Sequence, residues 1–348
     1  MISTGRRLRA TSLLLVGILG CGGANSGIPG VETANSAASP MRVAQLLETL
    51  SSDAMEGRRT GSAAAMRAAA VIENSMRQAG LRPGGDAGFL QRIPLAEGEN
   101  GRVVLLDGFH ALDTIPDGRR LEGGNVIGIL PGSDPAVRDE VVLVSAHYDH
   151  VGIRRPIQGD SIYNGADDNA SGVVAVLTIA RMLAEQGGTH RTIVFAALTG
   201  EEMGGLGTRW YLAHPVRPLE QTVANLNIEM IGRPDSLAGG PGKAWLTGYE
   251  RSNMGDGLKA GGIPIVPDPR PDQNFFRRSD NYAFARRGIP AHTLSTFNLH
   301  TDYHRPSDEA SKADPTHMVE VISAAARAVR LLADGPKPEW KPGGRPEN

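Results

Sequence analysis

Acidic side chains occur along the chain in small groups, and two of these groups are adjacent carboxylates. Glu201 and Glu202 follow an apolar run at residues 191–197, and Asp167 and Asp168 precede an apolar helical segment. Two neighbouring carboxylates repel each other and are costly to bury unless a cation compensates them. A solvated turn explains one such pair on its own, so the interpretation depends on what else the chain places beside them.

Histidines and further acids occupy comparable positions. His147 and Asp149 follow the apolar run VVLVS, and Glu229 stands at the end of another apolar run. Residues two apart in an extended chain share a face, so Asp149 is placed to orient His147, as carboxylates do for ligating histidines. The dense segment HTDYHRPSD adds two more histidines, of which His304 is the second, and its proline excludes a helix there.

This combination of side chains suits metal binding. Imidazole and carboxylate ligands without thiolate fit Zn²⁺, and also Mn²⁺ or Co²⁺. Cys21 is the only cysteine in the chain, which excludes both a Cys-ligated site and an intramolecular disulfide. In chain order, a histidine, an aspartate, a glutamate pair, a glutamate and a histidine supply enough ligands for two metal ions, with one carboxylate bridging them.

The elements that must position these residues follow an α/β pattern, in which strands alternate with helices. The pattern predicts a three-layer sandwich whose mostly parallel central sheet carries helices on both faces. Ligands bind such sheets at the carboxyl ends of the strands, where most of the acids and histidines stand. Apolar runs predict strands at residues 89–94, 102–107, 125–130, 141–145, 191–197, 222–228, 245–247 and 291–295, and apolar periodicity predicts helices at residues 41–50, 66–78, 171–185, 205–214 and 316–332.

Composition divides the chain of 348 residues into a leader, a tether, a folded domain and a tail. Residues 1–20 have the basic start and short apolar core of a signal peptide and, with Cys21, resemble a bacterial lipoprotein signal. Residues 21–40 are small and polar and predict a flexible tether. Residues 41–334 are predicted to fold as one domain, and residues 335–348 predict a tail that is disordered or draped on the surface.

Five sequence blocks, in order, resemble those of the co-catalytic zinc peptidases that include bacterial leucyl aminopeptidase, aminopeptidase Y and glutamate carboxypeptidase II. The blocks are AHYDHVG, NGADDNASG, LTGEEMGGLG, NIEMIGR and DYHRPSD. The resemblance covers residues 41–332 and implies a zinc exopeptidase-like fold. This chain departs from the family at Glu229, where many members carry Asp, and at Asn281, where many carry His.

The resemblance also implies roles for individual residues. It implies two zinc ions held by five side chains: His147 and Glu229 for one ion, Glu202 and His304 for the other, and Asp167 bridging both. Three more side chains acquire functional roles: Glu201 as general base, Tyr303 as a donor to the oxyanion, and Asp149 as the group that orients His147. A cis peptide bond after the bridging aspartate, here Asp167–Asp168, belongs to the same resemblance.

The implied activity is that of a metal-dependent exopeptidase, and first of all an aminopeptidase acting on peptides with a free N-terminus. Two alternatives stay open: a glutaminyl cyclase-like acyltransferase with one zinc ion, and a non-catalytic binding module of the same fold. The formal net charge of −2 gives no indication of a nucleic-acid partner. Lipid at Cys21 would anchor the exported protein to a membrane of the bacterial cell envelope.

Overall fold

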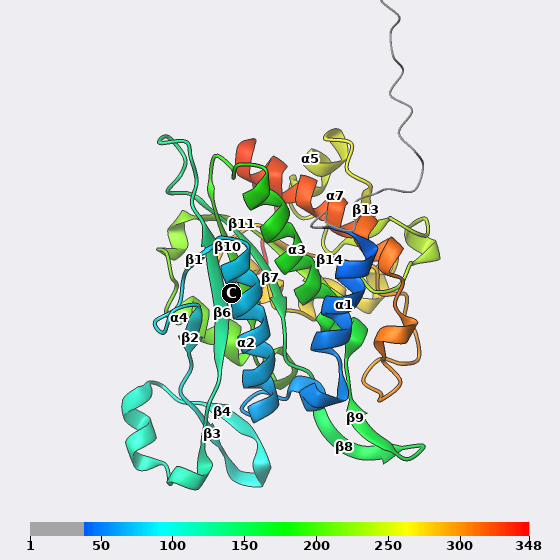
Figure 1. Ribbon diagram of the computed structural model, residues 1–348. Coiled ribbons are helices and arrows are strands. Elements are labelled where there is room, and N and C mark those ends of the chain that lie inside the picture. Colours follow the sequence, from blue (N-terminus) through cyan, green and yellow to red (C-terminus); the bar gives the residue numbers. More distant parts are fainter. Residues whose placement is uncertain (1–37, 348) are drawn as a thin grey trace, which may run out of the picture.

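The computed structural model describes residues 38–347, and a nine-stranded sheet runs through its centre (Figure 1). The four central strands β10, β7, β11 and β14 are parallel, whereas β6 and β12 run antiparallel beside them. The predicted three-layer α/β class is therefore confirmed, with antiparallel strands confined to the flanks. Across the sheet the strands are β1 (Arg82–Pro83), β6 (Gly124–Leu130), β10 (Thr192–Leu198), β7 (Val141–His147), β11 (Thr222–Glu229), β14 (Ala291–Ser295), β12 (Ala244–Leu246) and β13 (Ile265–Pro267), with β2 (Leu90–Arg92) also paired to β6.

Helices cover both faces of the sheet because side chains alternate between faces along each strand. In β7, Val142 and Val144 pack under helices α1, α2, α3 and α7, while Val141 and Leu143 pack under α4 and α6 on the other face. Both faces are thus apolar, as a buried parallel sheet requires. The helices are α1 (Pro40–Leu50), α2 (Ala63–Gln78), α3 (Gly172–Glu185), α4 (Leu206–Ala213), α5 (Met254–Ala260), α6 (Asn281–Arg286) and α7 (Pro315–Asp334).

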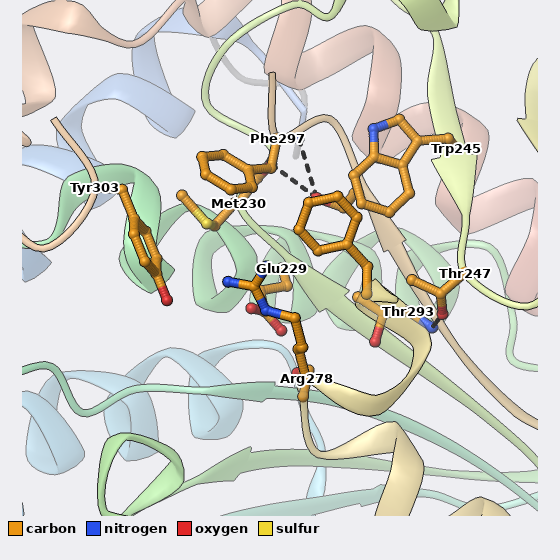
Figure 2. Close-up of a pocket in the computed structure, with 11 residues that line it drawn as sticks. Glu229, Met230, Trp245, Thr247, Arg278, Thr293, Phe297 and Tyr303 are labelled. Atoms are coloured by element: carbon orange, nitrogen blue, oxygen red, sulfur yellow. Dashed lines mark hydrogen bonds between the residues drawn. The ribbon is translucent and has the colours of Figure 1, made fainter. Parts of the chain in front are cut away.

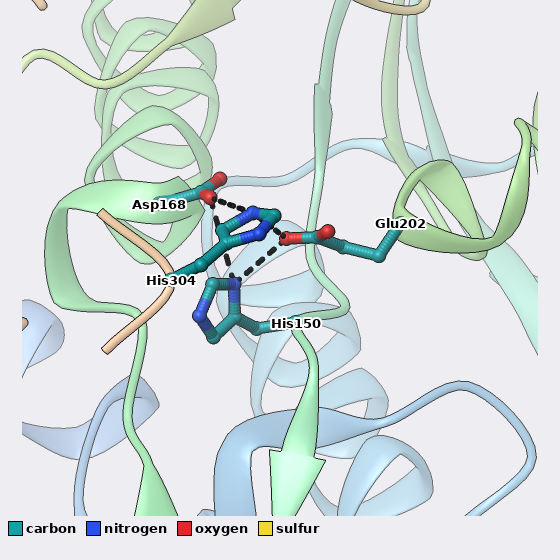
Figure 3. A group of neighbouring side chains, drawn as sticks. All are labelled: His150, Asp168, Glu202 and His304. Carbon is teal, nitrogen blue, oxygen red and sulfur yellow. Dashed lines mark ion pairs between the residues drawn. The ribbon is translucent and has the colours of Figure 1, made fainter. Parts of the chain in front are cut away.

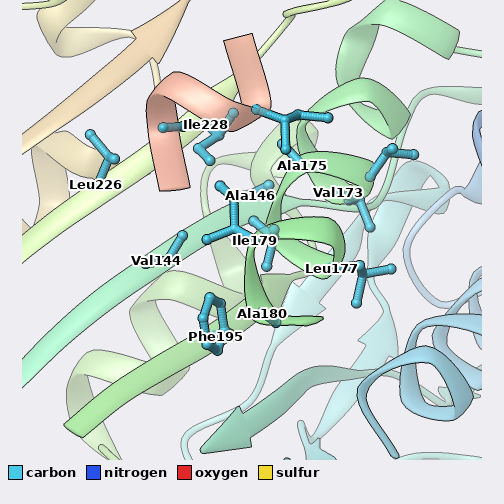
Figure 4. Packing of buried hydrophobic residues seen from close by; sticks show 14 of the residues in the cluster. Val144, Ala146, Val173, Ala175, Leu177, Ile179, Ala180, Phe195, Leu226 and Ile228 are labelled. Carbon is cyan, nitrogen blue, oxygen red and sulfur yellow. The ribbon is translucent and has the colours of Figure 1, made fainter. Parts of the chain in front are cut away.

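Helix α3 is the most deeply buried of these elements. Residues from Gly172 to Ala180 are all buried, and Val173, Ala175 and Ile179 lie in the same cluster as Val144 and Phe195 of the sheet (Figure 4). A helix that is apolar nearly all round belongs in a core. The burial fixes the start of α3, and with it the acidic turn that precedes the helix.

The carboxyl ends of the central strands lie at one level. His147, the last residue of β7, pairs in register with Leu198, the last of β10. On the other side Asn227 pairs with Ser145, which brings Glu229, the last residue of β11, level with His147. The register therefore gathers the loops that carry the acids and histidines at one edge of the sheet.

Several elements differ from the sequence-based expectations. A hairpin of β8 (Gly152–Ile157) and β9 (Asp160–Tyr163) and a small sheet of β3 (Leu95–Glu97), β4 (Val103–Leu105) and β5 (Arg120–Leu121) extend below the main sheet in Figure 1. Of these five strands only β4 was expected, within residues 102–107. The tail was predicted to be disordered or draped on the surface, and residues 335–347 contact the domain, where Trp340 donates from its indole to the Gly288 carbonyl at 2.9 Å.

The predicted leader, Cys21 and most of the tether lie outside the described residues. Within residues 38–347, no helix is both long enough and apolar enough to cross a membrane.

Candidate metal centre

Four side chains from separate parts of the chain converge at the carboxyl edge of the sheet (Figure 3). Each offers one ligand atom, and these atoms all lie within 4.8 Å of one another. Glu202 Oε1 is 2.9 Å from His150 Nδ1 and 3.1 Å from His304 Nε2. Asp168 Oδ2 is 3.0 Å from the same nitrogen of His304 and 3.7 Å from His150 Nδ1. Two imidazoles and two carboxylates at such separations form a donor set typical of zinc.

The second oxygen of Asp168 faces a different histidine. His147 Nε2 lies 3.4 Å from Asp168 Oδ1. Glu229 is close enough to influence His147, and burial raises the pKa of Glu229 to about 7 against the opposing effect of that imidazole. Asp168 thus stands between the His150–Glu202–His304 group and the His147–Glu229 group.

Buried polar atoms without partners are concentrated in this cluster. Among the described residues, five of these side chains carry a buried nitrogen or oxygen that makes no hydrogen bond: His147, His150, Asp168, Glu202 and Glu229. Leaving such atoms unpaired is costly, so a native structure normally supplies a partner. Metal ions ligated by imidazole and carboxylate would give each of these five side chains a partner, and the residues present therefore fit the metals that the sequence predicts.

Asp167, expected to bridge the metals, does not lie between the two histidine groups. Its Oδ1 accepts from the Gly232 amide at 2.7 Å and from Ser171, and its Oδ2 pairs with His300 at 2.9 Å. Asp168 occupies the shared position instead. The cis peptide bond likewise follows Asp168 and joins it to Asn169, so the expected Asp167–Asp168 position is wrong by one residue.

Asp149 contacts His147 through its main chain. The Nδ1 atom of His147 lies 3.1 Å from the Asp149 carbonyl, whereas the carboxylate is 3.9 Å away. The carboxylate accepts from the Glu201 amide at 3.2 Å and from the Thr60 hydroxyl at 3.0 Å. Asp149 therefore links the β7 loop to the turn that carries Glu201, in addition to lying beside His147.

Glu201 and Glu202 begin a short 3₁₀ turn, Glu201–Met203, directly after β10. Burial raises the pKa of Glu201 well above its usual value. Burial would raise the pKa of Glu202 too, but the close imidazoles of His150 and His304 hold it below the usual range. The neighbouring carboxylates of Asp168 and Glu202 outweigh burial and raise the pKa of His304 to about 10. Two adjacent glutamates with pKa values pushed apart are a common basis for separate catalytic roles.

Arg58 is a buried side chain that connects the loop after β7 with the turn before α3. The side chain is 1% exposed and donates to the carbonyls of Tyr148 at 2.8 Å, Asn164 at 2.7 Å and Gly165 at 2.8 Å. A fourth bond reaches the Leu50 carbonyl at 2.6 Å. The guanidinium thus ties the loop after β7 to the turn before α3 and adds a buried positive charge below an acidic cluster.

Two residues at the cluster have backbone conformations with a positive φ angle. Gly165 has a φ of 57°, and a Cβ there would lie 2.5 Å from the His150 ring, so the close approach requires glycine. His304 has a φ of 53°, a region uncommon for residues with a side chain and enriched at functional sites.

Tyr303 packs on the ligand that follows it. Its ring stacks on the His304 imidazole, with centroids 4.0 Å apart and planes 22° apart. Tyr303 also lines a small cavity together with Glu229. The phenol therefore stands at the border between the acidic cluster and an adjacent pocket.

Four residues of the site were missed from the sequence: His150, Asp168, Arg58 and Asp308. His150 had a visible signal, because it is the second imidazole of AHYDHVG. Asp308 accepts from the amides of Asp167 at 3.0 Å and Asp168 at 3.0 Å, a long-range contact that sequence spacing does not reveal.

Comparisons with known proteins agree with this geometry. A family model described as "Peptidase family M28" matches residues 125–329, more than half of the chain. Leucine aminopeptidase 1 of Trichophyton rubrum is 28% identical over 241 residues, covering 60% of this chain and 58% of that protein. The chain thus spans little more than half the length of this curated relative.

Solved structures show the same fold at low identity. A zinc aminopeptidase from Bacillus subtilis matches with a TM-score of 0.62 at 16% identity, covering 85% of this chain and 96% of that one. The glutaminyl cyclase of Porphyromonas gingivalis matches with a TM-score of 0.59 at 14% identity, covering 84% and 98%. Because both activities occur on this fold, the fold alone does not choose between them.

Proposed function

Because the chain belongs to peptidase family M28, we propose that it is a metal-dependent aminopeptidase that removes N-terminal residues from peptides with a free amine. One observation carries the proposal: the unpartnered buried atoms of five side chains fall into two groups that share Asp168. A single ion in either group leaves the other group unsatisfied. The arrangement favours two zinc ions, with Mn²⁺ or Co²⁺ as alternatives.

We assign the ligands by these groups. His147 and Glu229 would hold one ion, and Glu202, His304 and His150 would hold the other, with Asp168 in place of Asp167 as the shared carboxylate. When bound there, zinc would supply Lewis-acid chemistry, which polarises a carbonyl and lowers the pKa of water.

The remaining groups move protons and stabilise charge. Glu201 takes the proton from the attacking water as the water oxygen bonds to the carbonyl carbon, and then gives that proton to the leaving amine as the C–N bond breaks. The raised pKa of Glu201 suits a group that must both accept and donate a proton. Tyr303 donates from its phenol to the developing oxyanion. Asp149 keeps the Glu201 turn in place through the amide contact at 3.2 Å.

The function can be tested with a library of free-amine peptides and an N-acetylated copy of the same library. Mass spectrometry should detect stepwise loss of N-terminal residues from the free-amine library alone. A chelator should abolish the reaction and added zinc should restore it, with two zinc ions per chain by elemental analysis. Cyclisation of N-terminal glutamine with loss of ammonia, at one zinc per chain, would instead identify a glutaminyl cyclase. If the library does not react at all, the remaining alternative is a non-catalytic binding module.

We also propose that the protein is exported and anchored to a membrane of the cell envelope by lipid on Cys21. The support is the sequence alone, a basic start and short apolar core followed by ILGC. Wild type should sediment with membranes, and Cys21→Ser should be released or left unprocessed. Equal retention of both proteins in membranes contradicts the anchor.

A further inference from the structure

Arg278 stands at the rim of a small cavity that begins at the candidate metal centre (Figure 2). The cavity has a volume of about 30 Å³. Glu229 and Tyr303 line its metal side, and Trp245, Phe275 and Phe297 line its apolar side. A substrate held at the metal centre would therefore have this cavity as a neighbour.

One acidic and one basic side chain line the cavity, and metal binding would neutralise only the acidic one. Among the residues that line the cavity, only Glu229 and Arg278 are charged at neutral pH. Metal binding compensates Glu229, whereas Arg278 pairs with no carboxylate of residues 38–347 within 4.0 Å. Nearby Arg270, by contrast, is paired with Asp235 at 2.5 Å. Arg278 is exposed, so its unpaired positive charge lies at the solvent side of the cavity, where a substrate can reach it.

Aromatic packing holds that charge in a defined place. The Arg278 guanidinium carbon lies 5.0 Å from the centre of the Phe275 ring. Phe275 is itself buried and stacks on Trp245, with centroids 5.2 Å apart and planes 29° apart. A guanidinium positioned on an aromatic face keeps its planar fork of donors free for a ligand.

We propose that Arg278 is a specificity-determining residue that binds a carboxylate of the peptide substrate at this cavity. Guanidinium and carboxylate match in geometry and can form two parallel hydrogen bonds. The cavity of about 30 Å³ accommodates a group the size of two water molecules, which suits a carboxylate better than a large apolar side chain. The inference rests on the proposed peptidase function, since peptides carry carboxylates in two places. One is the side chain of an N-terminal Glu or Asp, and the other is the C-terminus of a short peptide.

Paired substrates distinguish the two sources. The first pair is Glu-Ala-Ala-amide and Gln-Ala-Ala-amide, and the second is Leu-Ala and Leu-Ala-amide. Wild type loaded with zinc should prefer the charged member of one pair by about 10- to 100-fold in kcat/KM, the range expected for hydrogen bonds to a charged group. Arg278→Gln should reduce that ratio to about one, and Arg278→Lys should keep part of it because the point charge remains.

Arg277 provides the matched control, because it is exposed like Arg278 but its guanidinium lies over Tyr282 and outside the cavity. Arg277→Gln should keep the wild-type ratio. The proposal is overturned if Arg278→Gln retains the wild-type preference, or if Arg277→Gln removes it equally.

A binding measurement separates failure of the inference from failure of the proposed function. Zinc-loaded Glu201→Gln is titrated calorimetrically with the same pairs, with and without Arg278→Gln. Tighter binding of the charged peptide that depends on Arg278 supports the inference even if wild type hydrolyses nothing. Equal binding of charged and neutral peptides overturns it even if hydrolysis is fast.

Discussion

The chain has two pairs of neighbouring acidic residues, Asp167–Asp168 and Glu201–Glu202, and each pair lies in its own turn. In each pair the second residue belongs to the four-residue cluster with His150 and His304, and the first does not. The partners of the first residues differ, however. Asp167 is engaged by an amide, a hydroxyl and an imidazole, whereas Glu201 stays partly exposed beside the cluster with its pKa raised by burial.

This difference separates a structural acid from a reactive one. A carboxylate that already accepts several hydrogen bonds holds its surroundings in place and has little capacity left for substrate. A carboxylate without such partners, in a site whose neighbours bind metal, is available to exchange a proton. Identical residue types in adjacent positions can therefore have unrelated roles, and substitution of each member tests the assignment.

The largest effect is expected at the shared carboxylate. Asp168→Asn removes a charge that both ligand groups use, so both ions should bind weakly and peptide hydrolysis should be lost. Elemental analysis after dialysis measures the metal content, and circular dichroism verifies that the variant is folded. Retention of both ions in Asp168→Asn, with loss of metal in Asp167→Asn, would restore the sequence-based assignment.

Glu201→Gln should follow in size. The amide keeps the shape of the side chain but cannot accept the proton, so kcat should fall by about 10²–10⁴, the usual contribution of general acid–base catalysis. Both zinc ions should remain, because Glu201 is assigned to the water and Glu202 to the metal. Glu202→Gln is the matched comparison and should lose zinc, with partial recovery of activity at excess zinc. The reverse pattern of metal loss would exchange the two roles.

The two acidic pairs also show how much of the fold and of the site could be predicted from the sequence. Apolar runs and their spacing predicted the central strands, because a sheet covered on both faces leaves few other patterns for β7 and β10. Placement of the acids at strand ends then predicted a metal site at the carboxyl edge of the sheet, the edge at which the acids and histidines converge. Which of two adjacent aspartates faces that site depends on the path of the turn, which is set by contacts from Arg58 and Asp308 far away in the chain. Local spacing carries no signal for such contacts.

Tyr303 and His304 form a third pair of neighbours with divided roles. Tyr303→Phe keeps the ring that stacks on His304 and removes only the phenol, so both ions should stay bound. Loss of one oxyanion donor typically lowers the rate by about 10²–10³. Steady-state kinetics should show the loss in kcat. An increase in KM at unchanged kcat would assign the phenol to substrate binding instead.

Substitution of His150 tests whether this histidine is a further ligand of the ion assigned to Glu202 and His304. His150→Gln removes an assigned ligand, so zinc affinity at this group should fall by at least the roughly 10- to 100-fold that is typical when a group supporting a ligand is lost. Competition with a chromophoric chelator measures the affinity, and activity should return as zinc is added. His110→Gln is a suitable control, because the His110 side chain is 78% exposed and distant from the cluster in the chain. Unchanged affinity in His150→Gln would restrict the ligands to Asp168, Glu202 and His304.

The smallest effect is expected at Asp167, the structural member of its pair. Asp167→Asn keeps one carbonyl oxygen for the Gly232 amide but loses the charge that faces His300. Removing such a buried interaction should cost about 1–2 kcal/mol of stability, which corresponds to a fall in Tm of a few degrees for a chain of this size. Zinc content and kcat/KM should stay near wild-type values, because neither oxygen of Asp167 faces the histidines of the metal groups. Thermal unfolding, elemental analysis and kinetics on one preparation measure all three quantities. A large fall in kcat/KM at unchanged Tm would mean that Asp167 acts in the reaction, and the contrast with Glu201 would then be lost.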